Sequence, residues 1–244
     1  MNIPLASCRA CCLGMAGLGR PADREIIQRI CHQLGFPRNI VLTHDAHIAL
    51  VGSALKALGV IIIAGIGSII YGINESGAEY RTGGWGYILD DEGSGYDIAR
   101  RALQAVVRAH DGRGPTTLLK DSILGQLNFS QPEQLVQWVH AASRTDIATL
   151  APIVFATAAE RDATAEAIIA YAVDELTLGA QIVLDKLYLR NTTCDIVLSG
   201  GLFEHHPSFV EQVFARLPDF APRAHPTLPQ KEPAYGAVLL ALLE

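Results

Sequence analysis

The sequence predicts an α/β fold, in which strands and helices alternate along one chain. Short apolar runs rich in β-branched residues have the length of buried strands, and they span 39–42, 60–63, 69–71 and 195–198. Segments with the period of a helix separate these runs, and glycines or prolines mark many of the boundaries. Because strands and helices interleave, the predicted class is α/β.

The first half of the chain is expected to open with a strand that ends in a glycine-rich turn. Pro21 then stands near the start of a helix that Gly35 closes, because proline is favoured in the first turn of a helix and glycine just past the last. A turn at 74–77 leads into the third strand of a β-meander. The expected strands are 9–19, 39–42, 60–63, 69–71 and 79–81, and the expected helices are 22–34, 46–58 and 95–110.

The second half is expected to be mainly helical. Thr116 is the expected cap of one helix, and Ser130 with Glu133 has the pattern of a capping box for another. The strongly periodic segment 159–189 predicts one long helix. The remaining expected elements are helices at 147–158, 208–217 and 235–243 and a buried strand at 195–198.

Length, composition and charge limit the function. The chain has 244 residues, of which half are hydrophobic and 18% are charged, so it can bury a sizeable core in one or two domains. Its net charge of −6, without any run of Lys or Arg, argues against binding to nucleic acid. The N-terminus lacks the charged-then-apolar order of a signal peptide, so a cytoplasmic protein is expected.

One stretch requires a test for a membrane span. Residues 57–73 contain no charged residue, which approaches the ~20 apolar residues that a spanning helix needs. Gly65 and Gly67 interrupt this stretch between two β-branched clusters. Two buried strands joined by a glycine turn therefore fit better than one helix, and no membrane partner is expected.

The cysteines suggest a reduced compartment. Their number is five, so a complete set of internal disulfides is impossible. Cys8, Cys11 and Cys12 have the spacing of a CxxC metal motif, but structural zinc sites need four ligands and no second pair occurs. We expect Cys11 and Cys12 instead to act as small apolar residues in a buried strand.

The segment 83–96 is the most informative in the chain. It contains five glycines, one tryptophan and three consecutive acids, Asp90, Asp91 and Glu92. Glycines at this density let the backbone approach a ligand closely, and neighbouring carboxylates can accept hydrogen bonds from a polyol. A solvated acidic loop is the alternative interpretation. The combination of Gly-Gly-Trp-Gly with Asp-Glu-Gly-Ser favours a sugar-binding loop.

Two earlier segments place candidate site residues at the ends of expected strands. Asp45 follows the strand at 39–42, where ligand sites of open α/β sheets gather, although an aspartate that opens a helix is also a common N-cap. Gly65, Gly67 and Ser68 form a turn between two strands. Backbone N–H groups in such a turn can bind an anion, although ordinary β-turns use the same residues.

A later segment has a comparable position. Ser199, Gly200 and Gly201 follow the buried strand at 195–198. Two adjacent glycines there allow close backbone approach to a nucleoside, although many turns between a strand and a helix have this composition.

Together these segments resemble the N-acetylhexosamine kinases, which are grouped with the BadF/BadG-type ATPases in the sugar kinase/actin/Hsp70 superfamily. The resemblance covers essentially the whole chain. It implies a two-lobed, actin-like (ribonuclease H-like) ATPase fold and the ATP-dependent phosphorylation of an amino sugar, N-acetylglucosamine or glucosamine. It also implies ATP and Mg²⁺ as cofactors and, as an expectation only, a homodimer.

The resemblance also implies roles for single residues. Asp45 matches the general base, which accepts the proton of the attacking sugar hydroxyl during phosphoryl transfer. Gly84 and Asp91 match residues at the sugar, and Glu92 supports the same loop. The implied nucleotide-binding residues are Gly65, Gly67, Ser68, Ser199, Gly200 and Gly201. The implied metal ligands are not identified.

The chain departs from the family pattern at three points. Ile66 replaces a threonine of the second phosphate motif, which removes a hydroxyl donor. Asp90 replaces a glycine, and the extra carboxylate suggests a preference for an amino sugar with a free ammonium group. The first phosphate motif, Asp-Gly-Gly-Gly-Thr, does not occur in the sequence.

The third departure shapes the expected domains. Residues 1–58 are expected to be the remnant of a truncated N-terminal lobe that the C-terminal helix at 235–244 completes, and residues 59–234 are expected to form the C-terminal lobe with the nucleotide and sugar loops. An internal start at Met1, a gene remnant and a second chain that supplies the missing part are the three explanations.

Two other functions remain open at this stage. The same superfamily includes ATPase activators of acyl-CoA dehydratases, which carry cysteines for an iron–sulfur cluster, but the cysteines here fall in predicted strands. The third hypothesis is a truncated sugar-binding remnant without catalysis.

Overall fold

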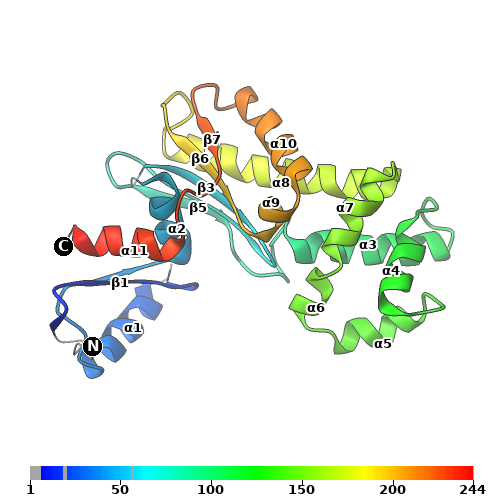
Figure 1. The fold of residues 1–244 in the computed structure, drawn as a ribbon, viewed down its shortest axis with the longest axis horizontal. Helices are drawn as coiled ribbons and strands as arrows, with labels where there is room; N and C mark the ends of the chain where they lie inside the picture. The colour runs from blue at the N-terminus through cyan, green and yellow to red at the C-terminus, as the bar shows by residue number, and fades with distance from the viewer. Residues whose placement is uncertain (1–6, 19–20, 56–57, 244) are drawn as a thin grey trace.

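The computed structural model describes residues 7–18, 21–55 and 58–243, and it has the expected α/β architecture (Figure 1). Its strands are β1 (Cys11–Gly14), β2 (Ile40–Thr43), β3 (Gly59–Ala64), β4 (Ser68–Ile73), β5 (Glu79–Gly83), β6 (Asp195–Ser199) and β7 (His225–Thr227). Its helices are α1 (Pro21–Gln33), α2 (Asp45–Ala54), α3 (Gly95–His110), α4 (Leu119–Leu127), α5 (Gln134–Ala141), α6 (Arg144–Ala148), α7 (Ala151–Ala159), α8 (Ala163–Lys186), α9 (Gly201–His205), α10 (Pro207–Arg216), the 3₁₀ turn η2 (Leu217–Asp219) and α11 (Pro233–Leu242).

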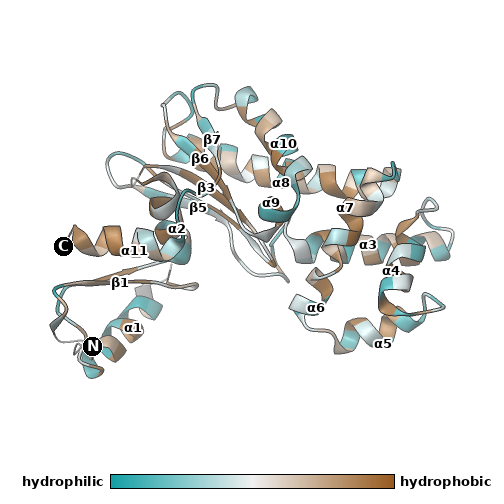
Figure 2. Cartoon of the chain, in the orientation of Figure 1, coloured by the Kyte–Doolittle hydropathy of each residue, from teal (hydrophilic) through white to brown (hydrophobic). Residues whose placement is uncertain are grey.

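The larger sheet has five strands in the order β5-β4-β3-β6-β7. The antiparallel pairs β3–β4 and β4–β5 form the expected meander, and β6 and β7 continue the sheet parallel to β3. The apolar stretch at 57–73 therefore provides two buried strands, as expected, rather than one helix. Figure 2 shows hydrophobic residues along these strands.

Helices cover both faces of the larger sheet. Because side chains alternate between the two faces of a strand, neighbouring residues of β3 enter different cores. Ile61 packs in a cluster with residues of α2, such as Leu50, whereas Val60 and Ile62 belong to the main core with α3, α7 and α8. This two-sided burial explains why β3 is a continuous apolar run in the sequence.

The smaller sheet consists of β1 and β2, paired in parallel with Cys11 opposite Ile40. Helix α11 packs against α2 and β1, so the last described helix lies beside the first described strand (Figure 1). This packing needs glycines, because a Cβ on Gly236 would overlap the carbonyl oxygen of Ile48, and a Cβ on Gly52 would lie 2.7 Å from the carbonyl oxygen of Glu232.

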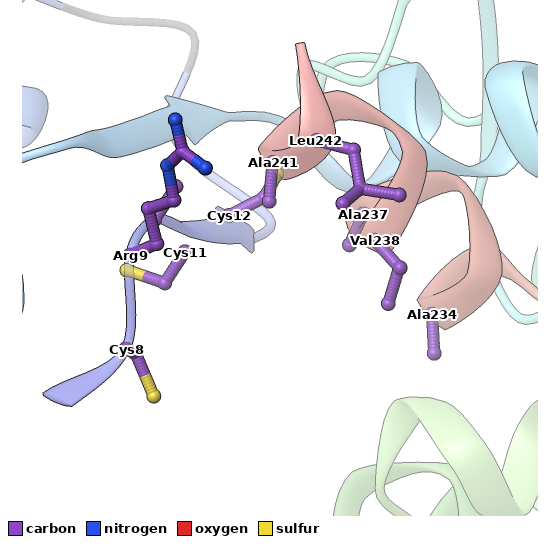
Figure 3. Close-up of a pocket in the computed structure, with 10 residues that line it drawn as sticks. Cys8, Arg9, Cys11, Cys12, Ala234, Ala237, Val238, Ala241 and Leu242 are labelled. Carbon is purple, nitrogen blue, oxygen red and sulfur yellow. The ribbon is translucent and has the colours of Figure 1, made fainter. Parts of the chain in front are cut away.

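The cysteines of β1 are less buried than expected. Cys11 and Cys12 are half-buried and, with the exposed Cys8, line a cavity of about 740 Å³ between β1 and α11 (Figure 3). The apolar wall opposite them includes Ala237 and Val238 of α11. Within the described ranges, no group of three or more His, Cys, Asp or Glu residues could hold a metal ion.

Helix α8 is long and apolar enough to cross a membrane by its length and composition. In the fold, 56% of its most apolar window is buried, because the helix packs against β3, β4 and β5 of the larger sheet. A helix in the core of a protein has this composition for the same reason.

Several expected boundaries were wrong. Helix α2 ends at Ala54 rather than at residue 58, because Leu55 adopts a left-handed conformation with φ +56°. The long helix spans Ala163–Lys186 rather than 159–189, and the helix expected at 147–158 is divided into α6 and α7. The short strand β7 was not expected.

Two expected helix caps were also wrong. The hydroxyl of Thr117, rather than that of Thr116, accepts a hydrogen bond from Leu119 N at 3.2 Å. Ser130 and Glu133 form no capping box, because Ser130 N donates to Gln134 Oε1 instead. The capping box is formed by Ser143 and Asp146 at the start of α6.

Candidate functional site

Two of the predicted nucleotide loops leave the larger sheet at the same end. Strands β3 and β6 are parallel, and Ile63 pairs with Ser199 at the last position of the ladder. Gly200 follows with φ +107°, and a Cβ there would lie 2.5 Å from the carbonyl oxygen of Ala64. Only glycine fits this position, so the loop at Gly200 lies directly against the end of β3.

The turn between β3 and β4 is bound to the acidic segment. Gly95 N donates to the carbonyl oxygen of Gly65 at 2.8 Å. Ser68 Oγ donates to the carbonyl oxygen of Glu92 at 2.7 Å, and Ser68 N donates to Asp91 Oδ1 at 3.4 Å. The predicted phosphate turn and the predicted sugar loop therefore form one unit, although the hydrogen bonds of Ser68 span 23 and 24 residues of sequence.

Asp91 is the buried carboxylate of this unit. Its exposed fraction is 4%, and its backbone has φ +68°, a left-handed conformation that Asp tolerates better than most residues. Burial raises the pKa of Asp91, and the hydrogen bond from Ser68 N and the charge of Arg144 oppose that shift. Arg144 Nη1 lies 3.4 Å from Asp91 Oδ2.

The rest of the acidic segment is a closed loop. Trp85 N donates to Asp90 Oδ2 at 2.9 Å, so the carboxylate that replaces the family's glycine closes the loop on itself. Gly84, with φ +72°, packs against Ile69, where a Cβ would lie 2.9 Å from Ile69 Cδ1. Burial, and then the neighbouring Asp90, raise the pKa of Glu92.

Asp45 stands apart from this unit. It is the first residue of α2, its side chain is exposed, and its Oδ1 accepts a hydrogen bond from Ala46 N at 2.9 Å. His44, not Asp45, occupies the N-cap position. The alternative interpretation of Asp45 as a simple N-cap is therefore wrong, and its carboxylate faces solvent at the start of the helix.

A polar cluster adjoins the start of α2. His44 Nε2 is 3.6 Å from Glu79 Oε2 of β5, and its ring meets Tyr71 of β4 edge-on at 4.7 Å between centroids. His47 Nδ1 lies 2.9 Å from the hydroxyl of Thr43. These contacts attach the start of α2 to the strand that leads into the sugar loop.

The cluster also shifts the pKa values of its members. Contact with His44 lowers the pKa of Glu79, and burial lowers the pKa of His47. Burial raises the pKa of Tyr71, and the nearby Glu79 raises it further. At neutral pH the cluster therefore favours an ionised Glu79, a neutral His47 and a protonated Tyr71.

A further cavity of about 780 Å³ adjoins the third predicted loop. Ser199 and Glu204 form one wall, and the segment 229–233 with Tyr235 forms the other. Because Ser199 precedes the glycine that contacts β3, this cavity opens next to the predicted nucleoside loop.

The predicted site residues thus fall into three groups. Gly67 and Ser68 meet Asp91 or Glu92 directly, and Gly65 accepts a hydrogen bond from Gly95 of the same segment. Ser199, Gly200 and Gly201 lie at the same end of the sheet. Asp45 forms the third group, since its neighbour His44 contacts Glu79 at the start of β5, whereas the sugar loop follows the end of β5 at Gly83. No sequence motif indicates Arg144 or Glu79, because each joins the site through a contact across long sequence separation.

Comparisons with known proteins agree with this arrangement. The sequence profile of the BadF/BadG/BcrA/BcrD ATPase family matches residues 1–241. The N-acetylmuramic acid/N-acetylglucosamine kinase of Clostridium acetobutylicum is 34% identical over 98% of this chain and 79% of that protein. The N-acetyl-D-glucosamine kinase of Dictyostelium discoideum is 33% identical over 95% of this chain and 74% of that protein.

A solved structure gives the same result for the fold. The crystal structure of a candidate N-acetylglucosamine kinase from Chromobacterium violaceum matches with a TM-score of 0.78 at 27% identity, and the match covers 99% of this chain and 78% of that one. This likeness confirms the expected actin-like ATPase fold class. Since the family profile and both relatives span nearly the whole chain, the protein belongs to the BadF/BadG/BcrA/BcrD ATPase family.

Proposed function

We propose that this protein transfers the γ-phosphoryl group of ATP to a hydroxyl of an amino sugar. The relatives described above are named as kinases of N-acetylglucosamine and N-acetylmuramic acid, which supports this substrate class. The reaction is a phosphoryl transfer, in which catalysis comes mainly from positioning and from charge stabilisation.

The observation that carries the proposal is the contact between the phosphate turn and the sugar loop. Ser68 bonds to both Asp91 and Glu92, so an anion held by the turn and a polyol held by the loop would be neighbours. Phosphoryl transfer needs the attacking and leaving oxygens in line at close range. The unit supplies this proximity from residues of the chain itself.

Asp45 is the proposed general base. Its exposed carboxylate, at the start of α2, is available to accept the proton of the sugar hydroxyl as the bond to phosphorus forms. Asp91 is the proposed acceptor for sugar hydroxyl donors, Gly84 allows close approach of the loop to the ring, and Glu92 supports the loop. The cluster around His44 and Glu79 holds the start of α2 against β5.

The residues at the carboxyl ends of β3 and β6 fit ATP. Gly65, Gly67 and Ser68 form the turn proposed to border the phosphates, in which Gly65 N already donates to the carbonyl oxygen of Gly67 and Ser68 N to Asp91. Ser199 lines the cavity proposed for the nucleoside, and Gly200 and Gly201 follow it. ATP supplies the phosphoryl group, and Mg²⁺ is proposed to enter with its phosphates, since Mg²⁺ is usually bound by substrate phosphates and one or two carboxylates.

The wider organisation is part of the same proposal. Residues 1–58 with the helix at 235–244 are proposed as one lobe and residues 59–234 as the other, with closure between them excluding water from the transfer. A homodimer is the proposed assembly. The use of ATP supports a cytoplasmic location.

The test is sugar-dependent release of ADP, measured with N-acetylglucosamine, glucosamine and N-acetylmuramic acid in turn. We expect ADP release only with a sugar present, together with a phosphorylated sugar in the mass spectrum. A preference for glucosamine that disappears in Asp90→Gly would support the role of the extra carboxylate, whereas ADP release that no sugar stimulates would refute the kinase.

A further inference from the structure

We propose that Arg144, at the start of α6, is the cationic side chain of the phosphate subsite. This inference rests on the kinase function proposed above and adds a residue that no motif of the sequence indicates. It assigns to the helical segment after α5 a direct role in binding the ATP phosphates.

The position of the guanidinium carries the inference. Arg144 Nη1 lies 3.4 Å from Asp91 Oδ2, and Arg144 Nη2 lies 2.9 Å from the place where a Cβ on Gly67 would be. The guanidinium therefore covers the open side of Gly67 within the phosphate turn. Asp91 Oδ2 lies equally close to that place, at 2.9 Å, so the guanidinium and the carboxylate border the turn together.

Most of the hydrogen-bonding capacity of Arg144 is available. A guanidinium has five N–H donors in a planar fork that matches a phosphate group. Its contact with Asp91 Oδ2, at 3.4 Å, is an ion pair without a hydrogen bond, and the ring of Tyr87 lies 5.7 Å from the guanidinium carbon. The side chain is 37% exposed, so several donors can reach an anion on the turn.

The local charge balance favours such a cation. Asp90, Asp91 and Glu92 are three acids close to a turn that would hold a polyphosphate, and Ile66 removes the hydroxyl donor of the family motif. Arg81, the arginine that precedes the loop, is used elsewhere, because it donates to the carbonyl oxygen of Gly83 and stacks on Trp85. Of these two arginines, Arg144 is the one left to offset the phosphate charge.

A purely structural ion pair with Asp91 is the alternative role for Arg144. It predicts that loss of the guanidinium weakens folding and sugar binding, since Asp91 would remain buried without its cation. The phosphate role predicts a loss confined to ligands that carry phosphates. Adenosine, which lacks phosphates, separates the two roles.

The test is isothermal titration calorimetry on the full chain with ATP, inorganic tripolyphosphate, adenosine and N-acetylglucosamine. In Arg144→Gln we expect the affinity for ATP and for tripolyphosphate to fall roughly ten- to a hundredfold, the effect of losing a charge-assisted hydrogen bond. The affinities for adenosine and for the sugar should stay within about twofold of the wild-type values, and Arg144→Lys should recover part of the loss.

Arg216→Gln is the matched control, because Arg216 of α10 forms an ion pair with Asp174 at 3.0 Å, away from the turn. It should leave all four affinities unchanged. An Arg144→Gln variant that binds ATP like the wild type, or that loses ATP, adenosine and sugar together, would overturn the phosphate role while leaving the kinase intact. A wild-type protein that binds neither ATP nor adenosine would refute the proposed function as well.

Discussion

The two carboxylates of the proposed site stand in opposite surroundings. Asp91 is 4% exposed, is held by Ser68 and Arg144, and belongs to the region of the five-stranded sheet. Asp45 is exposed at the first residue of α2, and the neighbouring His44 connects it to β5. A carboxylate that binds a ligand benefits from a fixed orientation, whereas a general base needs access to its proton.

The two sheets that carry these carboxylates also differ in how well they are covered. The five-stranded sheet has helices on both faces and a hydrophobic core on each of them. The two-stranded sheet is supported by α2 and α11, while α1 and α11 expose apolar side chains such as Ile26 and Leu242. We therefore expect the ligand-binding loops to lie in the more stable region, and the position of the proposed base to depend on the packing of α2 with α11.

The largest expected effect tests the proposed base. In Asp45→Asn we expect the rate of sugar phosphorylation to fall by ~10²–10⁴, the usual contribution of a general base. Because Asp45 is exposed and is not the N-cap, the melting temperature should stay unchanged. Measurement of kcat by ADP release, beside a thermal melt, checks both. Equal kcat values in the variant and the wild type would show that Asp45 is not the general base.

The second prediction concerns the other carboxylate. In Asp91→Asn we expect the affinity for the sugar to fall roughly ten- to a hundredfold, since the hydrogen bonds to a charged group are lost. Burial raises the pKa of Asp91 in the folded protein above its value in the unfolded chain. The stability that the protonated carboxyl contributes is therefore lost as pH rises through the folded pKa, and at neutral pH the ionised carboxylate opposes folding. The variant should therefore melt at or above the wild-type temperature at neutral pH. Calorimetric titration with N-acetylglucosamine and a thermal melt measure the two effects.

A lower melting temperature for Asp91→Asn would mean that the ion pair with Arg144 outweighs the burial of the carboxylate. Asp91 would then stabilise the fold as well as bind the sugar, and the contrast between the two carboxylates would need revision.

The third prediction addresses the packing of the smaller region. In Gly236→Ala the new Cβ would overlap the carbonyl oxygen of Ile48 and lie 2.5 Å from Gly52 N. Overpacking of this kind costs about 1–3 kcal/mol. Hydrogen exchange should show faster exchange in α2 and α11, with β3 and β6 unaffected, because local openings need not involve the whole fold.

Gly125→Ala is the control for this substitution. Gly125 is an exposed residue of α4, and no atom lies within 4 Å of the place where a Cβ would be, so alanine should raise stability by up to ~1 kcal/mol through helix propensity. Exchange that accelerates equally in both regions of Gly236→Ala would show that the two regions unfold together.

The sequence predicts best what local interactions determine. Helix α3 has the expected bounds, because Ser94 accepts a hydrogen bond from Asp97 N and basic residues end the last turn. Strand β7 was missed because its three residues include Pro226 and show no apolar alternation. The early end of α2 was missed because Leu55, unlike a glycine, does not indicate a left-handed residue.

In the candidate site, too, the sequence predicts the local motifs better than the contacts between them. Each loop carries a local motif, so its residues could be chosen from the sequence and from the family resemblance. Their contacts could not, because Ser68 and Asp91 are brought together by the turn of a sheet and Arg144 comes from a different helix. The roles of the predicted site residues remain predictions until the substitutions above are measured.

The smallest expected effect is a dependence of the protein's stability on pH. It arises in the polar cluster that attaches α2 to the larger sheet. The groups that face one another are His44 and His47 at the start of α2, Tyr71 of β4, Glu79 of β5 and Arg24 of α1. Burial lowers the pKa of His47 below 6.5, so its contribution to stability is lost as pH falls from about 6.5 through the folded pKa.

The lowered pKa of Glu79 acts in the same direction, with its contribution lost below about 4.5 as pH falls through the folded value. We therefore expect the melting temperature to decrease on mild acidification, and His47→Gln to remove the part of the decrease that begins near 6.5. Thermal melts across this pH range, with hydrogen exchange of α2, measure it. A decrease that His47→Gln leaves unchanged would assign the acid sensitivity to other groups, and the link between α2 and β5 would then be independent of protonation at His47.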